Sequence, residues 1–226
     1  MIKVERTEKP KILEKKEQQW LSAYKTALNA YQTNPSESNK IKKKKAENKY
    51  NNGALKKALK NMFMDKCAYC ESHIPHIYFG DIEHFRPKSK FPNQCFEWDN
   101  LLLSCGICNS KMYKSDKFPE TNEGGFFVNP VTENPDEFFN FEFDPQTGTA
   151  NVIPKNERGN TTEIELGLNR IDLVKHRSSI VKKMAVIAIK ANQGDVKCLN
   201  EIHSYCGKED EYSAFAIALV KRFNLL

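Results

Sequence analysis

The sequence lacks the marks of an exported or membrane-embedded protein. None of its apolar runs approaches the roughly 18 residues that a membrane-spanning helix needs, and the opening Met1-Ile-Lys-Val-Glu-Arg6 has no apolar stretch of the signal-peptide kind. It also lacks internal repeats and, apart from one lysine-rich stretch, low-complexity tracts. We therefore expect a cytoplasmic protein without a membrane segment.

The composition sets the size of the protein and leaves the type of its partner open. With 226 residues, of which 39% are hydrophobic, the chain has room for one ordinary domain, or for a small nucleus with helical additions. A mean hydropathy of -0.65 describes a polar chain overall. The net charge of +6 permits a polyanionic partner, although many enzymes without a nucleic-acid role are as basic.

Cysteine is present in an odd number, seven, and the cytosol does not maintain structural disulfides. Cys67 and Cys70 form one Cys-x-x-Cys pair, and Cys105 and Cys108 form another. This spacing lets a tight turn direct two sulfurs toward one tetrahedral ion, so the two pairs predict a closed Cys₄ zinc site. Four thiolates leave no position for water, so the zinc is structural. The alternatives are separate buried thiols or a redox pair.

The remaining cysteines, Cys95, Cys198 and Cys206, lack partners at ligand spacing and are interpreted as buried thiols. Hydrophobic periodicity and turn residues predict helices on both sides of a centre of short elements. Helices are expected over residues 11–31, after a cap at Ser36 or Ser38, after Asn51-Asn52-Gly53, over about 161–168 and 172–192, and twice more before 226; two hairpin strands are expected over 139–143 and 149–153.

A dense run of lysines lies between residues 40 and 60. Two interpretations stay open: a helix face exposed to water, or a surface that follows the phosphates of a nucleic acid. The run consists of Lys40, Lys42, Lys43, Lys44, Lys45, Lys49, Lys56, Lys57 and Lys60.

Between and after the cysteine pairs lie residues suited to hydrolysis. Glu83 and His84 are adjacent in a short predicted strand, and Asn109 directly follows the second pair. A carboxylate and an amide oxygen are donors that Mg²⁺ accepts, and an imidazole can take a proton from water. Asp81 is either a partner of His84 or a solvent-facing residue. Arg86, Lys88 and Lys111 can hold flanking phosphates, or are surface charge.

The runs Asp81-Ile-Glu-His-Phe-Arg-Pro-Lys88 and Trp98-Asp-Asn-Leu-Leu-Leu-Ser-Cys-Gly-Ile-Cys-Asn-Ser-Lys111 resemble the zinc-knuckled form of the HNH endonuclease motif. Within that family the sequence is more similar to the PtuB group, the HNH subunits of Septu anti-phage defence systems. That group also occurs with retrons and accompanies an ATPase. The opening Met1–Arg6 and Leu166-Gly-Leu-Asn-Arg170 are similar to this group as well.

The resemblance implies an α+β fold: a ββα-metal nucleus with a Cys₄ zinc knuckle between N-terminal and C-terminal helices. It implies that His84 is the general base, and that Glu83, where the family usually has Asp or His, is a ligand of a catalytic Mg²⁺ or Mn²⁺. Asn109, at the start of the nuclease helix, is implied as the second ligand. Asn100 is implied to brace the hairpin loop and to orient His84.

The resulting hypothesis is a metal-dependent nuclease, the effector of an anti-phage complex with a PtuA-like ATPase, with DNA favoured over RNA. One alternative is a catalytically idle zinc module that binds nucleic acid or protein; another is an RNase. We expect three segments: a lysine-rich helical segment over 1–64, the zinc-stapled core over 65–118, and a hairpin and helical segment over 119–226.

Overall fold

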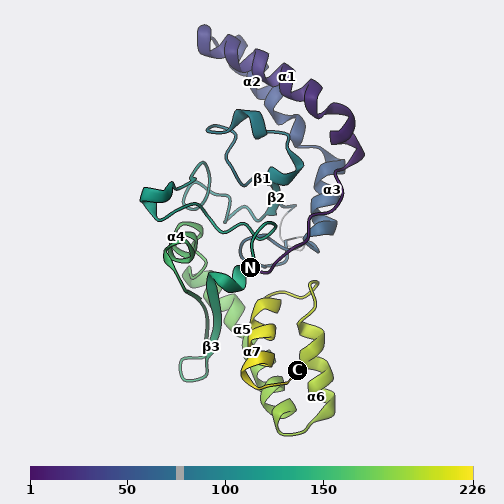
Figure 1. Ribbon diagram of the computed structural model, residues 1–226, viewed down its shortest axis with the longest axis vertical. Coiled ribbons are helices and arrows are strands. Elements are labelled where there is room, and N and C mark those ends of the chain that lie inside the picture. The colour runs from purple at the N-terminus through teal and green to yellow at the C-terminus, as the bar shows by residue number, and fades with distance from the viewer. Residues whose placement is uncertain (75–78, 226) are drawn as a thin grey trace.

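The computed structural model describes residues 1–74 and 79–225, and within them the chain has the predicted α+β fold (Figure 1). The helices are α1 (Lys11–Thr33), α2 (Glu37–Glu47), α3 (Gly53–Met62), α4 (Glu157–Leu166), α5 (Ile171–Asn192), α6 (Val196–Tyr205) and α7 (Ser213–Arg222). The strands are β1 (Asp81–His84), β2 (Leu101–Ser104), β3 (Phe139–Asp144) and β4 (Thr149–Pro154).

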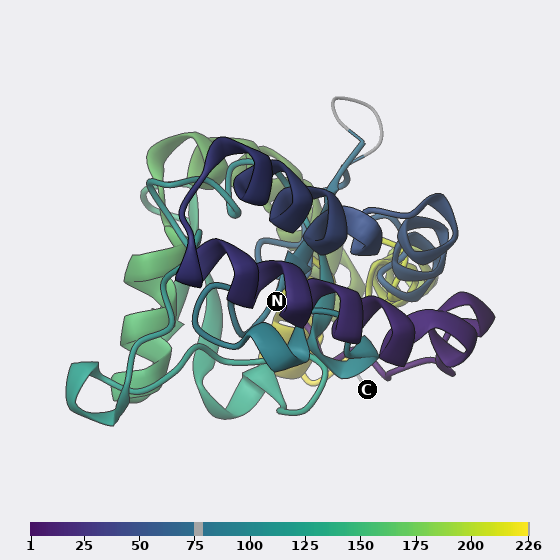
Figure 2. The ribbon, with the colours of Figure 1, turned by 90° about the horizontal axis from the view of Figure 1, so that it is seen from above.

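The N-terminal helices cover one end of the molecule, where α1 and α2 lie side by side (Figures 1 and 2). The predicted cap at Ser36 is confirmed, since Ser36 Oγ accepts a hydrogen bond from Asn39 N (3.3 Å) at the start of α2. Helix α3 begins after Asn52, whose Oδ1 accepts a hydrogen bond from Ala54 N (2.8 Å). Helix α1 buries Tyr24, whose ring meets Phe96 edge-on with centroids 6.2 Å apart. The helical end is thereby anchored to the loop that precedes β2.

The central element is a short antiparallel hairpin of β1 and β2, in which Asp81 pairs with Ser104 and His84 with Leu101. Its apolar residues Leu101, Leu102 and Leu103 are fully buried, and α3 packs against β2. The N–H of Ala68 donates to the carbonyl of Leu103 (2.8 Å). This bond joins the hairpin to the turn that carries the first cysteine pair.

The C-terminal part is built on the predicted second hairpin, in which β3 and β4 pair antiparallel, and on α5 to α7. Arg177 of α5 is 2% exposed and donates to the carbonyls of Ala150 and Leu168 (both 2.8 Å) and to Asn169 Oδ1 (2.9 Å). The guanidinium thus joins α5 to β4 and to the corner before α5, because it donates hydrogen bonds to buried oxygen atoms in both places.

Two predicted helix positions differ from the structure. The helix expected over 161–168 is α4 (Glu157–Leu166), which starts earlier because the Asn156 side chain accepts from Gly159 N (2.9 Å). The helix that the resemblance implies after Asn109 is wrong for this chain, since residues 109–116 form successive turns and bends. Lys114 N donates to Cys108 O (3.1 Å), six residues earlier, and this bond does not fit a helix.

The buried side chains form one continuous core from Leu13 in α1 to Leu219 in α7. The division into segments 1–64, 65–118 and 119–226 therefore stays a prediction. Across residues 1–74 and 79–225, helices of the length and apolarity needed to cross a membrane are absent.

Candidate metal centre and active site

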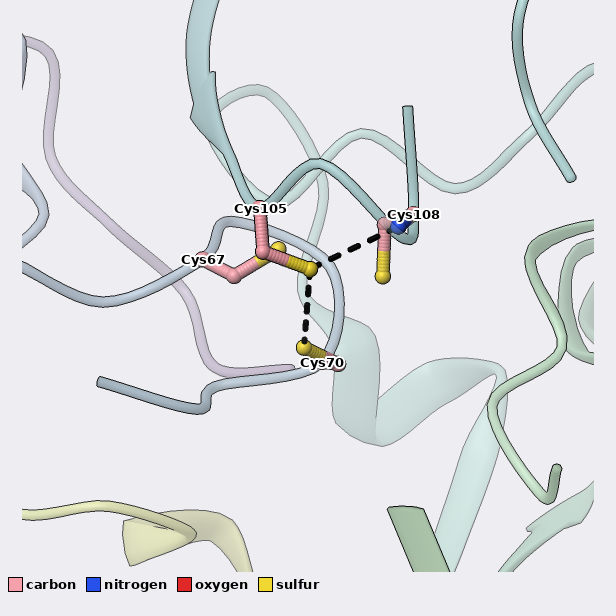
Figure 3. Close-up of side chains that lie close together, drawn as sticks. All are labelled: Cys67, Cys70, Cys105 and Cys108. Carbon is pink, nitrogen blue, oxygen red and sulfur yellow. Dashed lines mark hydrogen bonds between the residues drawn. The ribbon is translucent and has the colours of Figure 1, made fainter. Parts of the chain in front are cut away.

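The four predicted zinc ligands converge from two loops (Figure 3). Cys67 and Cys70 follow α3, and Cys105 and Cys108 follow β2; all four sulfurs lie within 4.8 Å of one another. The Sγ atoms of Cys70 and Cys105 are 3.9 Å apart. Thiolates on a tetrahedral Zn²⁺, with Zn–S near 2.3 Å, are roughly 3.8 Å apart. The cluster therefore fits zinc in size and in ligand chemistry.

The turns around the cysteines direct the sulfurs inward. Cys67 N donates to Ser72 O and Glu71 N to Cys67 O (both 3.0 Å), which closes the first turn, and Cys108 N donates to Cys105 Sγ (3.4 Å) in the second. Hydrogen bonds from neighbouring cysteines lower the pKa of Cys70 and of Cys105, whereas burial raises the pKa of Cys67 and the hydrogen bond with Cys105 raises that of Cys108. Two of the four thiols are thus favoured as thiolates, which is the form that binds metal.

Glu83 lies on β1, buried, in an ion pair with Lys114. The Lys114 side chain is fully buried, and its ammonium also donates to the carbonyl of His84 (2.8 Å). Burial raises the pKa of Glu83, and the positive charge of Lys114 opposes that rise. Lys114 is a site residue that the sequence did not reveal, because its spacing does not separate it from Lys111 or Lys117.

Asn109 is held on the same side of the hairpin as Glu83. Its Nδ2 donates to Asp81 Oδ2 (3.2 Å), and Asp81 and Glu83 share a side of β1 because side chains alternate along a strand. The sequence suggested Asp81 as a partner of His84, whereas the structure gives Asp81 a hydrogen bond from Asn109. Carboxylate and amide oxygens thus gather on this side of β1.

His84 follows Glu83 at the end of β1 and is 4% exposed. Its Nε2 lies 2.9 Å from the carbonyl oxygen of Cys95. Because a carbonyl only accepts, Nε2 carries the proton and Nδ1 keeps its lone pair. Burial lowers the pKa of His84 to about 3, and the charges of Lys88 and Lys114 act in the same direction. The imidazole is therefore neutral near pH 7 with a lone pair on Nδ1, and its low pKa makes it a weaker base than a solvent-exposed histidine.

Asn100, which lies just before β2, holds the loop opposite His84. Its Oδ1 accepts from Arg86 N (2.7 Å), and its Nδ2 donates to the carbonyls of Arg86 and Gln94 (both 3.0 Å). Gln94 directly precedes Cys95, the residue whose carbonyl binds His84. Asn100 is 5% exposed, so these bonds are shielded from water.

The three candidate phosphate-binding residues have different surroundings. Lys88 is half-buried, 3.4 Å from the Tyr50 hydroxyl and 3.6 Å from a carboxylate oxygen of Glu47. Arg86 is exposed and lies over the ring of Phe91, 5.7 Å from its centroid. Lys111 is exposed. Arg86 and Lys111 are thus open to a ligand, whereas Lys88 already has partners.

Tyr50 is the last residue of the short 3₁₀ turn after α2, and it connects the lysine-rich segment with His84. The rings of Tyr50 and His84 meet edge-on with centroids 4.5 Å apart. Within α2, Lys40 and Lys43 form ion pairs with Glu37 and Glu47. Exposed lysines of α2 without such pairs are Lys42, Lys44 and Lys45. A helix that carries these charges ends beside the candidate base.

Comparison with known families identifies the class of the core. The sequence model of the HNH endonuclease family matches residues 67–115, which include both cysteine pairs, Glu83, His84 and Asn109. Residues 67–115 of the chain are thus similar to the HNH endonuclease domain.

Among curated proteins, two relatives are Septu PtuB proteins. The Septu protein PtuB of Bacillus mycoides (strain KBAB4) is 28% identical over 171 residues, which cover 64% of this chain and 57% of that protein. The Septu protein PtuB of Bacillus thuringiensis is 33% identical over 122 residues, which cover 52% of this chain and 42% of that protein. The chain therefore spans about half the length of these relatives.

A third relative is the Septu protein PtuA of Bacillus mycoides (strain KBAB4), 26% identical over 153 residues. The match covers 56% of this chain and 20% of that protein, so a segment of PtuA resembles this chain. No solved structure matches the sequence significantly.

The geometry of the cysteines predicts about one zinc ion per chain, because four thiolates complete one tetrahedral shell. Replacing any of Cys67, Cys70, Cys105 or Cys108 by serine should remove the metal and lower the melting temperature. The matched control is Cys198→Ser, which should leave the zinc content unchanged. Elemental analysis of each purified variant checks this. A folded parent protein without zinc would contradict the assignment.

Proposed function

We propose that this chain is a divalent-metal-dependent endonuclease that hydrolyses phosphodiester bonds, with DNA as the favoured substrate. The observation that carries the proposal is His84: buried, neutral, with Nε2 bound to Cys95 O and Nδ1 left as a proton acceptor. It stands on the strand that also bears Glu83, in a domain that matches the HNH endonuclease family.

His84 acts as the general base in this proposal. Its Nδ1 takes a proton from the attacking water, the resulting hydroxide bonds to the phosphorus, and the phosphorus–oxygen bond on the opposite side breaks. The leaving oxygen then takes a proton from water, and the imidazolium returns its proton to the solvent. Asn100 keeps the base in place by bonding the loop that presents the Cys95 carbonyl. Tyr50 supports the ring through the edge-on contact.

Glu83 and Asn109 are the residues that would hold a catalytic Mg²⁺ or Mn²⁺, with Asp81 beside them. Their oxygens are the hard donors that these ions prefer, and the contact between Asn109 and Asp81 brings two of these side chains together. When bound, such an ion supplies positive charge to the scissile phosphate. Lys114 holds the Glu83 carboxylate within the hairpin.

Hydrolysis by an activated water does not need the sugar's 2′-hydroxyl, so the proposed mechanism applies to DNA and to RNA alike. The alternative within enzymes is an RNase, and an assay on both substrates separates the two. The other alternative, an idle zinc module, needs the four cysteines but no histidine held as a neutral base. The arrangement of His84 favours the enzyme.

The biological role we infer is that of the effector in a Septu-type anti-phage complex with a PtuA-like ATPase partner, in the cytoplasm. Similarity to two Septu PtuB proteins supports it. The resemblance between this chain and a segment of a Septu PtuA protein adds to the support, because it places similar sequences in both components.

Replacing the base tests the enzyme assignment. His84→Gln keeps an amide that can donate to Cys95 O but has no nitrogen that accepts a proton. Loss of a general base lowers rates by roughly 10²–10⁴-fold. We therefore expect cleavage of DNA with Mg²⁺ to fall by that factor, while zinc content and DNA binding stay close to those of the parent.

The matched control is His176→Gln, which removes a histidine from the exposed side of α5. It should cleave at the parent rate. Cleavage at the parent rate by the His84→Gln protein would refute the assignment.

A second prediction concerns the exposed lysines of α2. The triple variant Lys42→Ala, Lys44→Ala and Lys45→Ala should weaken binding to all DNA sequences by a similar factor. It should also flatten the plot of log affinity against log salt by about 0.9 for each phosphate that the variant no longer neutralises. A salt titration measures both effects.

The control for this variant carries the same charge change on α5, at Lys182, Lys183 and Lys190, which are also exposed. Its salt slope should equal that of the parent. An unchanged slope in the α2 variant would show that this helix face only contacts water.

A further inference from the structure

The corner between α4 and α5 packs directly on the second cysteine pair. It consists of residues 166–170, and Gly167 adopts a left-handed backbone with φ of 57°. A Cβ added at Gly167 would lie 2.1 Å from the ring of Tyr113, so the ring occupies the space of the absent side chain. Tyr113 belongs to the turns that follow Cys108. The corner and these turns therefore fit closely.

Arg170 reaches from this corner to the metal cluster. Its Nη1 lies 3.6 Å from Cys108 Sγ and donates to the carbonyl of Gly167 (3.0 Å). Its guanidinium carbon stands 5.4 Å from the centroid of the Tyr113 ring. The side chain is thus fixed by the backbone below it and the ring beside it. The charge is directed at a sulfur.

The charge of a Cys₄ zinc site explains why a cation belongs there. Four thiolates outweigh one Zn²⁺ ion, so the loaded site carries net negative charge, and three of its sulfurs belong to buried residues. Partly buried charge is costly unless an opposite charge or a donor lies close. A guanidinium supplies both and stays protonated at any ordinary pH.

We propose that Arg170 is the neighbouring cation of the zinc centre, and that it positions the second cysteine pair by clamping it to the C-terminal helices. This inference rests on the zinc site proposed above. Its consequence reaches the active site, because Asn109 and Lys114 follow Cys108 on the same turns and contact Asp81 and Glu83.

Residues 166–170 are also hydrogen-bonded to the C-terminal part of the protein, which restricts the movement of Arg170. The side-chain amide of Asn169 pairs with the backbone of β4, because its Oδ1 accepts from Val152 N (2.9 Å) and its Nδ2 donates to Val152 O (2.7 Å). Arg177 donates to Asn169 Oδ1 (2.9 Å). The hairpin of β3 and β4 is therefore linked to the zinc ligands through two consecutive residues, Asn169 and Arg170.

The test is the rate at which zinc leaves the full-length protein when an excess of a chromogenic chelator is added. Loss of a group that bonds to a metal ligand typically lowers the affinity for the metal by about 10–100-fold. Arg170→Gln should therefore release zinc about 10–100-fold faster than the parent. Arg170→Lys, which keeps the charge but not the fork, should restore part of the difference. Lys175→Gln, which makes the same charge change at an exposed position of α5, should match the parent.

Cobalt substitution gives a second readout that a purely structural role would not change. A cation beside a thiolate stabilises the sulfur electrons, so removing it should move the sulfur-to-cobalt charge-transfer band of Arg170→Gln to longer wavelength. Arg170→Lys should lie between Arg170→Gln and the parent.

The outcomes separate this inference from the zinc assignment. A parent protein without zinc overturns the zinc centre itself. A parent with zinc, together with an Arg170→Gln protein that has the parent's release rate and the parent's cobalt spectrum, overturns the role of Arg170 alone. If Arg170→Gln does not fold, Arg170→Met, which keeps an apolar stem and carries no charge, takes its place in both comparisons, and parent values for both readouts in that variant overturn the role of Arg170.

Discussion

The convergence of four cysteine sulfurs on one point is the constraint on which the rest of the structure depends. The two pairs enclose the segment that contains β1, β2 and the loop between them, and all four sulfurs lie within 4.8 Å of one another. An isolated hairpin of four-residue strands is at best marginally stable in water. Structural zinc contributes roughly 10–16 kcal/mol in small zinc domains. We therefore infer that zinc bound by the four cysteines stabilises the hairpin of β1 and β2.

A fixed hairpin in turn allows polar side chains to be buried where they are needed. Glu83 and Lys114 form an ion pair away from water, and His84 is held neutral with its donor nitrogen bound to Cys95 O. Burying ions costs several kcal/mol each unless they are well paired, so such a site persists only on a rigid base. The zinc turns, α3 packed on β2 and the Asn100 bonds supply that base.

Features set by short spacing were predictable from the sequence, and those set by distant contacts were not. Two Cys-x-x-Cys pairs predict one metal site because two residues between thiolates suffice to form each half. The contacts of Lys114, Tyr50 and Arg170 join residues between 31 and 62 positions apart, and local periodicity does not encode them. The helix expected after Asn109 is replaced by turns, and Lys114 within these turns pairs with Glu83, 31 positions earlier in the sequence.

Amide hydrogen exchange with and without zinc tests the central claim most directly. Zinc is stripped from the full-length protein with a chelator, and exchange is compared with that of the loaded form. The account predicts that the amides of β1 and β2 lose their protection, while those of α5, which lies in the C-terminal part of the core, keep theirs. Equal protection of β1 and β2 in both forms would contradict it.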